Sequence, residues 1–177
     1  MGLDLGTNCG YAYAWQVGDS WQRSPGFCGQ LDLSAGKFDS GAIRFVRLTH
    51  YLQVLKPAII FYEDVKYDPQ PGLTAAQAVA RVSTAAELFG AFKGALCLWA
   101  ETRGVPLTGF TITEIKKHAA SGRANKEKMI QACNEKFGTT FSAEGYEQTG
   151  VDNIADAMFV LDLGLQEYGL GQFKETA

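Results

Sequence analysis

Histidine and cysteine are scarce in this chain of 177 residues, with two and four copies. The cysteines, Cys9, Cys28, Cys97 and Cys133, are scattered, and no two of them form a Cys-x-x-Cys pair. Cys97 and Cys133 fall in helical patterns, so we expect buried thiols in a reducing interior. No apolar run reaches the roughly 18 residues that a membrane span needs, and no secretory signal peptide is visible. These absences predict a protein without a membrane-spanning helix.

An excess of basic charge is also missing. Lysine and arginine number 16 against 19 acidic residues, which gives a net charge of -3. Nucleic-acid binding would therefore require a local basic patch. Hydrophobic residues make up 46% of the chain, enough for a core. Because the chain has ordinary domain length and shows no internal repeat or long linker, we expect one domain over residues 1–177.

The order of apolar patterns and turn signals predicts an α/β fold. The expected strands cover residues 1–5, 11–16, a stretch between Trp21 and Leu33, 58–62 and 105–110. The expected helices cover residues 38–55, 74–103, 111–120, 125–137 and 151–168, with a loop at 138–150. Three antiparallel strands followed by strand–helix alternation predict a mixed sheet, antiparallel at first and then parallel, with helices on its faces.

Two carboxylates lie at the ends of strands that should be buried. Asp4 stands between Leu3 and Leu5 before a glycine turn, and Glu63 ends the apolar run 58–62. A buried acid is costly unless something compensates its charge, and carboxylate ligands alone suit magnesium or manganese. The pattern therefore predicts a metal-dependent enzyme. By strand alternation, Asp64 should point to the opposite face from Glu63.

The last helix offers further ligands. Asp152 and Asp156 are four residues apart, and Asn153 and Asp156 three apart, so either pair can share a helix face. We predict Asp4, Glu63, Asp152 and Asp156 as catalytic residues and metal ligands. Asp152 is preferred to Asn153 because a carboxylate neutralises a divalent cation and an amide does not. The alternatives are a turn-capping Asp4, a surface Glu63, a solvated Asp156, and an Asp152 that serves only the helix dipole.

Five motifs, in this order along the chain, resemble the RuvC-type Holliday junction resolvases of the ribonuclease H-like superfamily, of the phage or otherwise divergent kind. The motifs are Gly2-x-Asp4-x-Gly6-x-x-x-Gly10, Tyr62-Glu63-Asp64-Val65, Gly90-x-x-x-Gly94, Ile115-Lys116-Lys117 and Ile154-Ala155-Asp156-Ala157-Met158. The resemblance implies a ribonuclease H-like fold and a homodimeric, Mg²⁺-dependent endonuclease, with Mn²⁺ as a substitute, that nicks branched DNA in the cytoplasm of a bacterium or phage-infected cell.

Carried over by position, the resemblance assigns Asp4, Glu63 and Asp156 to the acidic sites of that family. The family has an acid or a histidine three residues before the last acid, whereas this chain has Asn153, with Asp152 one residue earlier. The expected reaction is two-metal hydrolysis of a phosphodiester bond, in which a water is activated and the leaving oxygen is neutralised.

A local basic patch does exist. Six of the 16 basic residues lie between positions 116 and 136, and only one follows Phe141. Such a patch suits phosphate contacts, although a solvated face neutralised by neighbouring glutamates would look alike. Tyr67 could stack on an unpaired base or be an ordinary loop residue. His118, which follows two lysines, could contact a phosphate or be a lone histidine without such a contact. The predicted DNA contacts are Lys66, Tyr67, Lys116, Lys117, Arg123, Lys126 and Lys128.

The expected helix 74–103 is apolar almost all round and contains the small residues Gly90 and Gly94. This composition indicates a second partner besides the sheet, either another helix of the chain or a dimer mate; with the resemblance, we expect the dimer.

Two other functions are compatible with parts of the sequence. The opening Gly2-Leu3-Asp4-Leu5-Gly6-Thr7 is similar to the phosphate-binding start of actin-like ATPases and sugar kinases, but the chain lacks their second lobe and second phosphate loop. A catalytically weak protein that binds branched DNA is the second alternative, because Asn153 replaces a ligand.

Overall fold

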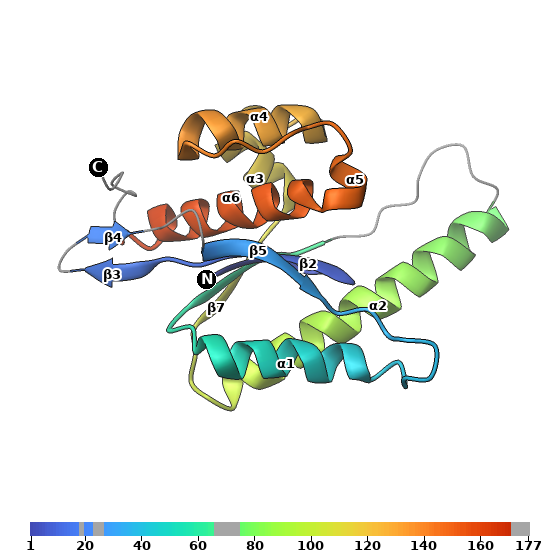
Figure 1. Cartoon of the computed structure of the whole chain (residues 1–177). Helices are drawn as coiled ribbons and strands as arrows, with labels where there is room; N and C mark the ends of the chain where they lie inside the picture. The colour runs from blue at the N-terminus through green and yellow to red at the C-terminus, as the bar shows by residue number, and fades with distance from the viewer. Residues whose placement is uncertain (18–19, 23–26, 66–74, 171–177) are drawn as a thin grey trace.

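The computed structural model describes residues 1–17, 20–22, 27–65 and 75–170 (Figure 1). Its main sheet has five strands in the order β5-β2-β1-β6-β7, and β3 and β4 form a separate pair. The strands are β1 (Gly2–Asp4), β2 (Asn8–Ala12), β3 (Trp15–Val17), β4 (Ser20–Gln22), β5 (Cys28–Asp32), β6 (Ile60–Glu63) and β7 (Leu107–Phe110). β1, β2 and β5 pair antiparallel, and β1, β6 and β7 pair parallel. The predicted mixed sheet is confirmed.

Helices cover both faces of this sheet (Figure 1). They are α1 (Ile43–Leu55), α2 (Ala75–Glu101), α3 (Ile112–Ala119), α4 (Lys126–Phe137), α5 (Tyr146–Thr149) and α6 (Val151–Glu167). α1 and α2 lie on one face and α6 on the other, with α3 and α4 packed outside α6. None of the helices that the structure describes has both the length and the apolar character of a membrane crossing.

The two-residue period of the strands divides the core into two layers. Along β6, Ile60 and Tyr62 belong to the hydrophobic cluster beneath α1 and α2, whereas Phe61 belongs to the cluster beneath α6. Leu3 of β1 also faces α1 and α2. Because side chains alternate along a strand, the next residues, Asp4 and Glu63, face α6.

Glycines let α6 lie directly on the sheet. A Cβ atom at Gly2 would overlap the backbone of Ala157, and one at Gly10 would overlap the backbone of Asn153. On the helix side of this contact, a Cβ atom at Gly164 of α6 would overlap the Phe61 ring of β6. These contacts exclude any larger residue and fix the height of α6 above β1 and β2.

Several predicted boundaries were wrong. The helix expected from residue 38 begins at Ile43, because Asp39 accepts a hydrogen bond from the backbone N–H of Gly36 in a turn. The strand expected at 11–16 is divided between β2 and β3. The strand expected between Trp21 and Leu33 is divided between β4 and β5. The expected loop 138–150 contains the short helix α5. In contrast, α1 ends as expected before Pro57, with Lys56 in the left-handed conformation.

Candidate active site

Asp4 and Glu63 lie side by side at the ends of two parallel strands. The pairing of Leu3 with Tyr62 places the next residue of β1 beside the next residue of β6. Both carboxylates point toward α6, and Glu63 is only 9% exposed. As predicted, Asp64 points to the other face, where its carboxylate binds the ammonium group of Lys93 from α2 at 2.6 Å.

The last helix adds a third carboxylate. Asp156 lies on the face of α6 that the glycine contacts press against the sheet, and it is 1% exposed. Asp4, Glu63 and Asp156 each offer one carboxylate oxygen, and these oxygens lie within 4.8 Å of one another. Segments from the beginning, middle and end of the chain therefore meet in one acidic cluster, which we call the carboxylate triad.

The carboxylate triad is electrostatically strained. Burial, followed by the charge of Glu63, raises the pKa of Asp4 well above its ordinary value. Burial and the charge of Asp156 raise the pKa of Glu63 to about 7. Burial also raises the pKa of Asp156, against the opposing effect of Lys126. Like charges in a poorly solvated place disfavour the ionised forms, so the negative charge of the triad is not fully compensated.

One oxygen of the triad has no hydrogen-bond partner. The Oδ1 atom of Asp156 is buried and unpaired among the described residues. Buried polar atoms normally have a partner, and an exception requires an explanation such as an absent ion. Oxygen ligands from three carboxylates suit a hard divalent cation, magnesium or manganese. The residues present therefore fit a divalent metal ion.

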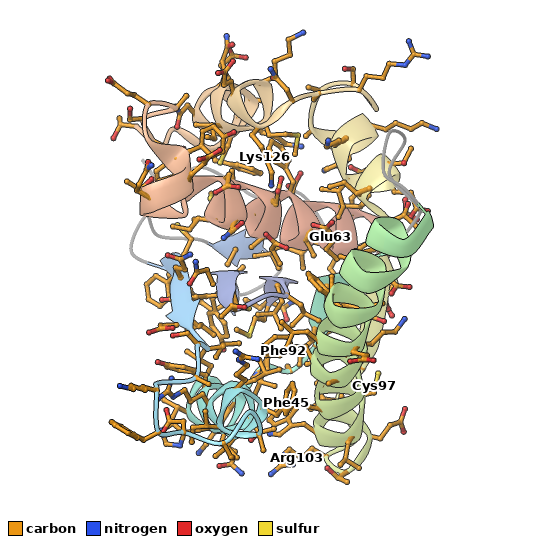
Figure 2. All side chains as sticks on the ribbon, turned by 90° about the vertical axis from the view of Figure 1, so that its right-hand side faces the viewer. Phe45, Glu63, Phe92, Cys97, Arg103 and Lys126 are labelled. Atoms are coloured by element: carbon orange, nitrogen blue, oxygen red, sulfur yellow. The ribbon has the colours of Figure 1, made fainter. Side chains whose placement is uncertain are left out.

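Lys126 reaches into this cluster from α4. Its ammonium group lies 2.6 Å from the Oδ2 atom of Asp156 and 3.3 Å from that of Asp152. Figure 2 shows Lys126 and Glu63 on the α6 side of the sheet, whereas Phe45 and Phe92 fill the layer between α1 and α2. Burial lowers the pKa of Lys126, but the neighbouring carboxylates outweigh this effect, so the pKa lies above its ordinary value.

Asp152 and Asn153 point to different partners. Asp152 is 13% exposed and faces the cluster through Lys126. Asn153 donates a hydrogen bond from its side-chain nitrogen to the backbone oxygen of Asn8. The geometry supports Asp152 as the source of negative charge, and its role as a fourth ligand stays a prediction.

Solved structures of RuvC from Thermus thermophilus resemble the chain over nearly its whole length. One, described as the T. thermophilus RuvC structure, has a TM-score of 0.58 and 16% identity and covers 97% of this chain and 96% of that one. The other, RuvC in complex with Holliday junction substrate, has a TM-score of 0.62 and 18% identity and covers 96% and 93%. The fold is that of RuvC.

The likeness to RuvC confirms the resemblance predicted from the motifs at the level of the fold. No family model matches the sequence, and no curated protein is similar to it in sequence. At 16–18% identity, the likeness shows the architecture, and the roles of individual side chains have to be argued from this chain's own geometry.

The other predicted DNA contacts differ in exposure. Lys117, Arg123 and Lys128 are exposed, and Lys116 is half-buried on the side of α3 near the triad. None of these four residues forms an ion pair with another described residue. Lys66 and Tyr67 lie outside the described residues. Lys126 is the exception, because its ammonium binds the acidic cluster instead of facing outward.

Sequence reasoning missed two features of this face. One is the inward position of Lys126, the first residue of α4, for which the local sequence carries no signal. The second is an ion-pair cluster in which Asp162 accepts from His118 at 2.6 Å and from Lys136 at 2.5 Å. His118 is thus held by α6 and α4, which leaves its ring no role on an open surface.

Proposed function

We propose that this protein is a metal-dependent endonuclease that cleaves branched DNA such as Holliday junctions. The observation that carries the proposal is the carboxylate triad, three convergent acids from β1, β6 and α6 with an unpaired buried oxygen on Asp156. RuvC, whose fold the chain shares, has been solved in complex with a Holliday junction substrate. This supports branched DNA as the substrate class.

In this proposal, Asp4, Glu63 and Asp156 hold Mg²⁺, with Mn²⁺ as a substitute, and Asp152 adds negative charge. When bound, the metal would activate a water and neutralise the leaving oxygen of the phosphodiester. The protein's own contribution is positional. The strand ends and α6 hold the acids in place, while Lys116, Lys117, Arg123 and Lys128 provide positive charge on the same side of the sheet for the DNA backbone. The reaction would take place in the bacterial or phage-infected cytoplasm.

Cleavage of a panel of four-way, forked, flapped and linear DNAs with Mg²⁺ or Mn²⁺ tests this function. Asp4→Asn and Glu63→Gln should each abolish cutting and leave junction binding nearly intact, because lysine and arginine hold the phosphates. Asp64→Asn is the matched control, since Asp64 is adjacent to Glu63 but faces Lys93. It should cut normally.

Normal cutting by either triad variant would show that the site is misplaced. Binding of junctions without any cutting by the wild type would instead favour the non-enzymatic alternative. Turnover of ATP would favour the kinase-like alternative, for which the described structure offers no second lobe.

A further inference from the structure

The position of Lys126 links the acidic cluster to α4, one of the helices that carry the exposed basic residues. Lys126 is the first residue of α4, and Asn125 caps that helix by accepting a hydrogen bond from the backbone N–H of Lys128. The cap sets the start of α4, and from there the lysine stem runs inward to α6. Its side chain is still 37% exposed. The ammonium group therefore contacts the cluster although the side chain is not fully buried.

The ammonium group of Lys126 partly compensates the negative charge of the acidic cluster. Its ammonium contacts Oδ2 of Asp156, the most deeply buried acid of the cluster, and Oδ2 of Asp152. Unpaired buried charge is strongly unfavourable. The lysine is thus the internal counter-ion of these two aspartates.

A divalent ion on the triad would compete with this lysine. Asp156 belongs both to the triad and to the Lys126 ion pair, so the two cations would share one carboxylate. Two positive charges within a few ångströms repel strongly where water is scarce. The lysine stem is flexible and the side chain is 37% exposed, so it can turn outward once a divalent cation compensates the charge of Asp156.

We infer that Lys126 exchanges partners, so that its ammonium binds Asp156 and Asp152 in the metal-free protein and is released by a divalent cation to bind a DNA phosphate. The inference rests on the proposed function. Lys126 then couples two binding events. Metal and branched DNA each strengthen the binding of the other, and by linkage the factor is the same in both directions.

The first test uses the protein without DNA. Mn²⁺ affinity is measured by titration calorimetry for the wild type, Lys126→Met and Lys128→Met. Lys128→Met removes the same charge from the same helix at an exposed position, so it controls for general electrostatics. We expect Lys126→Met to bind Mn²⁺ about tenfold more tightly, which corresponds to about 1.4 kcal/mol, and Lys128→Met to change the affinity less than about twofold.

The second test adds DNA. Affinity for a four-way junction is measured with and without Ca²⁺, and denaturing gels verify that the DNA stays intact. The wild type should bind the junction about fivefold or more tightly with Ca²⁺, a typical size for such coupling. Lys126→Met should lose that enhancement, whereas Lys128→Met should bind more weakly overall but retain it. Lys126→Gln, which keeps a polar head without charge, repeats both measurements in case the methionine variant does not fold.

The outcomes separate this inference from the function it rests on. If the wild type binds no Mn²⁺ at millimolar concentration, the metal site and the exchange both fail. If the wild type binds Mn²⁺ but both Lys126 variants bind it equally or more weakly, only the exchange fails. Retention of the Ca²⁺ enhancement in the Lys126 variants would also overturn the exchange, because the coupling would then run through other groups.

Discussion

Asp156 lies in an unfavourable environment for a carboxylate. It is 1% exposed, one of its oxygens has no partner among the described residues, and the other is held by Lys126. Asp162, six residues further along the same helix, is also largely buried but accepts hydrogen bonds from His118 and Lys136. As a result, the pKa of Asp162 is lowered despite its burial, whereas that of Asp156 is raised. On α6, the charge of Asp162 is thus compensated by its two partners, whereas that of Asp156 is compensated only in part.

The raised pKa of Glu63 makes the metal-free protein less stable at higher pH. Its folded pKa of about 7 lies above the ordinary 4.5. The stabilising contribution of protonated Glu63 is therefore complete below pH 4.5 and lost as the pH rises through 7. From roughly pH 5.5 to 8 we expect the free energy of unfolding to fall by about 2 kcal/mol.

Urea denaturation in the presence of a chelator measures this pH dependence. Glu63→Gln should reduce it, because the amide does not titrate, and Asp64→Asn should preserve it. Equal stability of the wild type at both pH values would contradict the strained triad.

Asp152 and Asn153 should contribute unequally to cleavage. Asp152 faces the cluster, whereas Asn153 is bound to the backbone of Asn8. We expect Asp152→Asn to reduce the cleavage rate at saturating Mg²⁺ severely, by about a hundredfold, as is typical for loss of a group that supports a metal site. Asn153→Ala should cost less. The reverse order would mean that Asn153 holds the ligand position and that Asp152 serves only the helix N-terminus.

At the scale of elements, α6 organises the site. Gly2 and Gly10 let it approach β1 and β2 closely, and on its outer side it packs against α3 and α4. The ion-pair cluster of His118, Lys136 and Asp162 ties these three helices together. The helices that carry the basic residues are therefore held in a set position relative to the helix that carries Asp156.

The exposed basic residues of α3, α4 and their connection should bind DNA phosphates without regard to sequence. Replacing Lys117, Arg123 and Lys128 together by glutamine should weaken junction binding and reduce the slope of log affinity against log salt by about 0.9 per lost contact. Fluorescence anisotropy at several salt concentrations measures the slope. Lys37→Gln, an exposed change in the segment before α1 on the other face, is the control. An unchanged slope would assign the three residues to a solvated surface.

At the scale of the whole molecule, the two faces of the sheet differ in character. Both faces are covered by an apolar cluster, and the carboxylate triad lies on the face under α6. Along α2, Gly90 and Gly94 have open space where a side chain would be, and Leu98 is 67% exposed. These residues are not covered by described parts of the chain, which supports our proposal that α2 meets a second copy.

We therefore expect a homodimer through α2. Gly94→Leu should separate the two helices where their backbones come close and shift the protein toward monomer, as measured by analytical ultracentrifugation at micromolar concentration. Gly41→Leu is the control, because a side chain there also meets nothing within 4 Å but lies in the segment before α1. A wild type that sediments as a monomer would contradict the dimer.

The sequence by itself determined which strands are buried and that Glu63 and Asp64 take opposite faces. The apolar run 58–62 and the apolar neighbours of Asp4 indicated the buried strands. Because successive side chains of a strand point to opposite faces, Glu63 and Asp64 had to separate. The mixed sheet followed from the order of apolar patterns and turn signals, and the resemblance to RuvC followed from five ordered motifs. Boundaries near residues 11–43 were not predictable, since tight turns such as the one at Gly36 and Asp39 interrupt patterns that look continuous.

Only the tertiary structure decided what meets at the acidic cluster. Lys126 looked like one more surface lysine, because nothing in the local sequence tells which way the first residue of a helix points. Its contact with Asp156 depends on the packing of α4 on α6 and on the cap at Asn125. The same holds for His118 and Asp162, which are 44 residues apart. Contacts between distant segments are set by how helices pack, and packing depends on the whole core rather than on any one pattern.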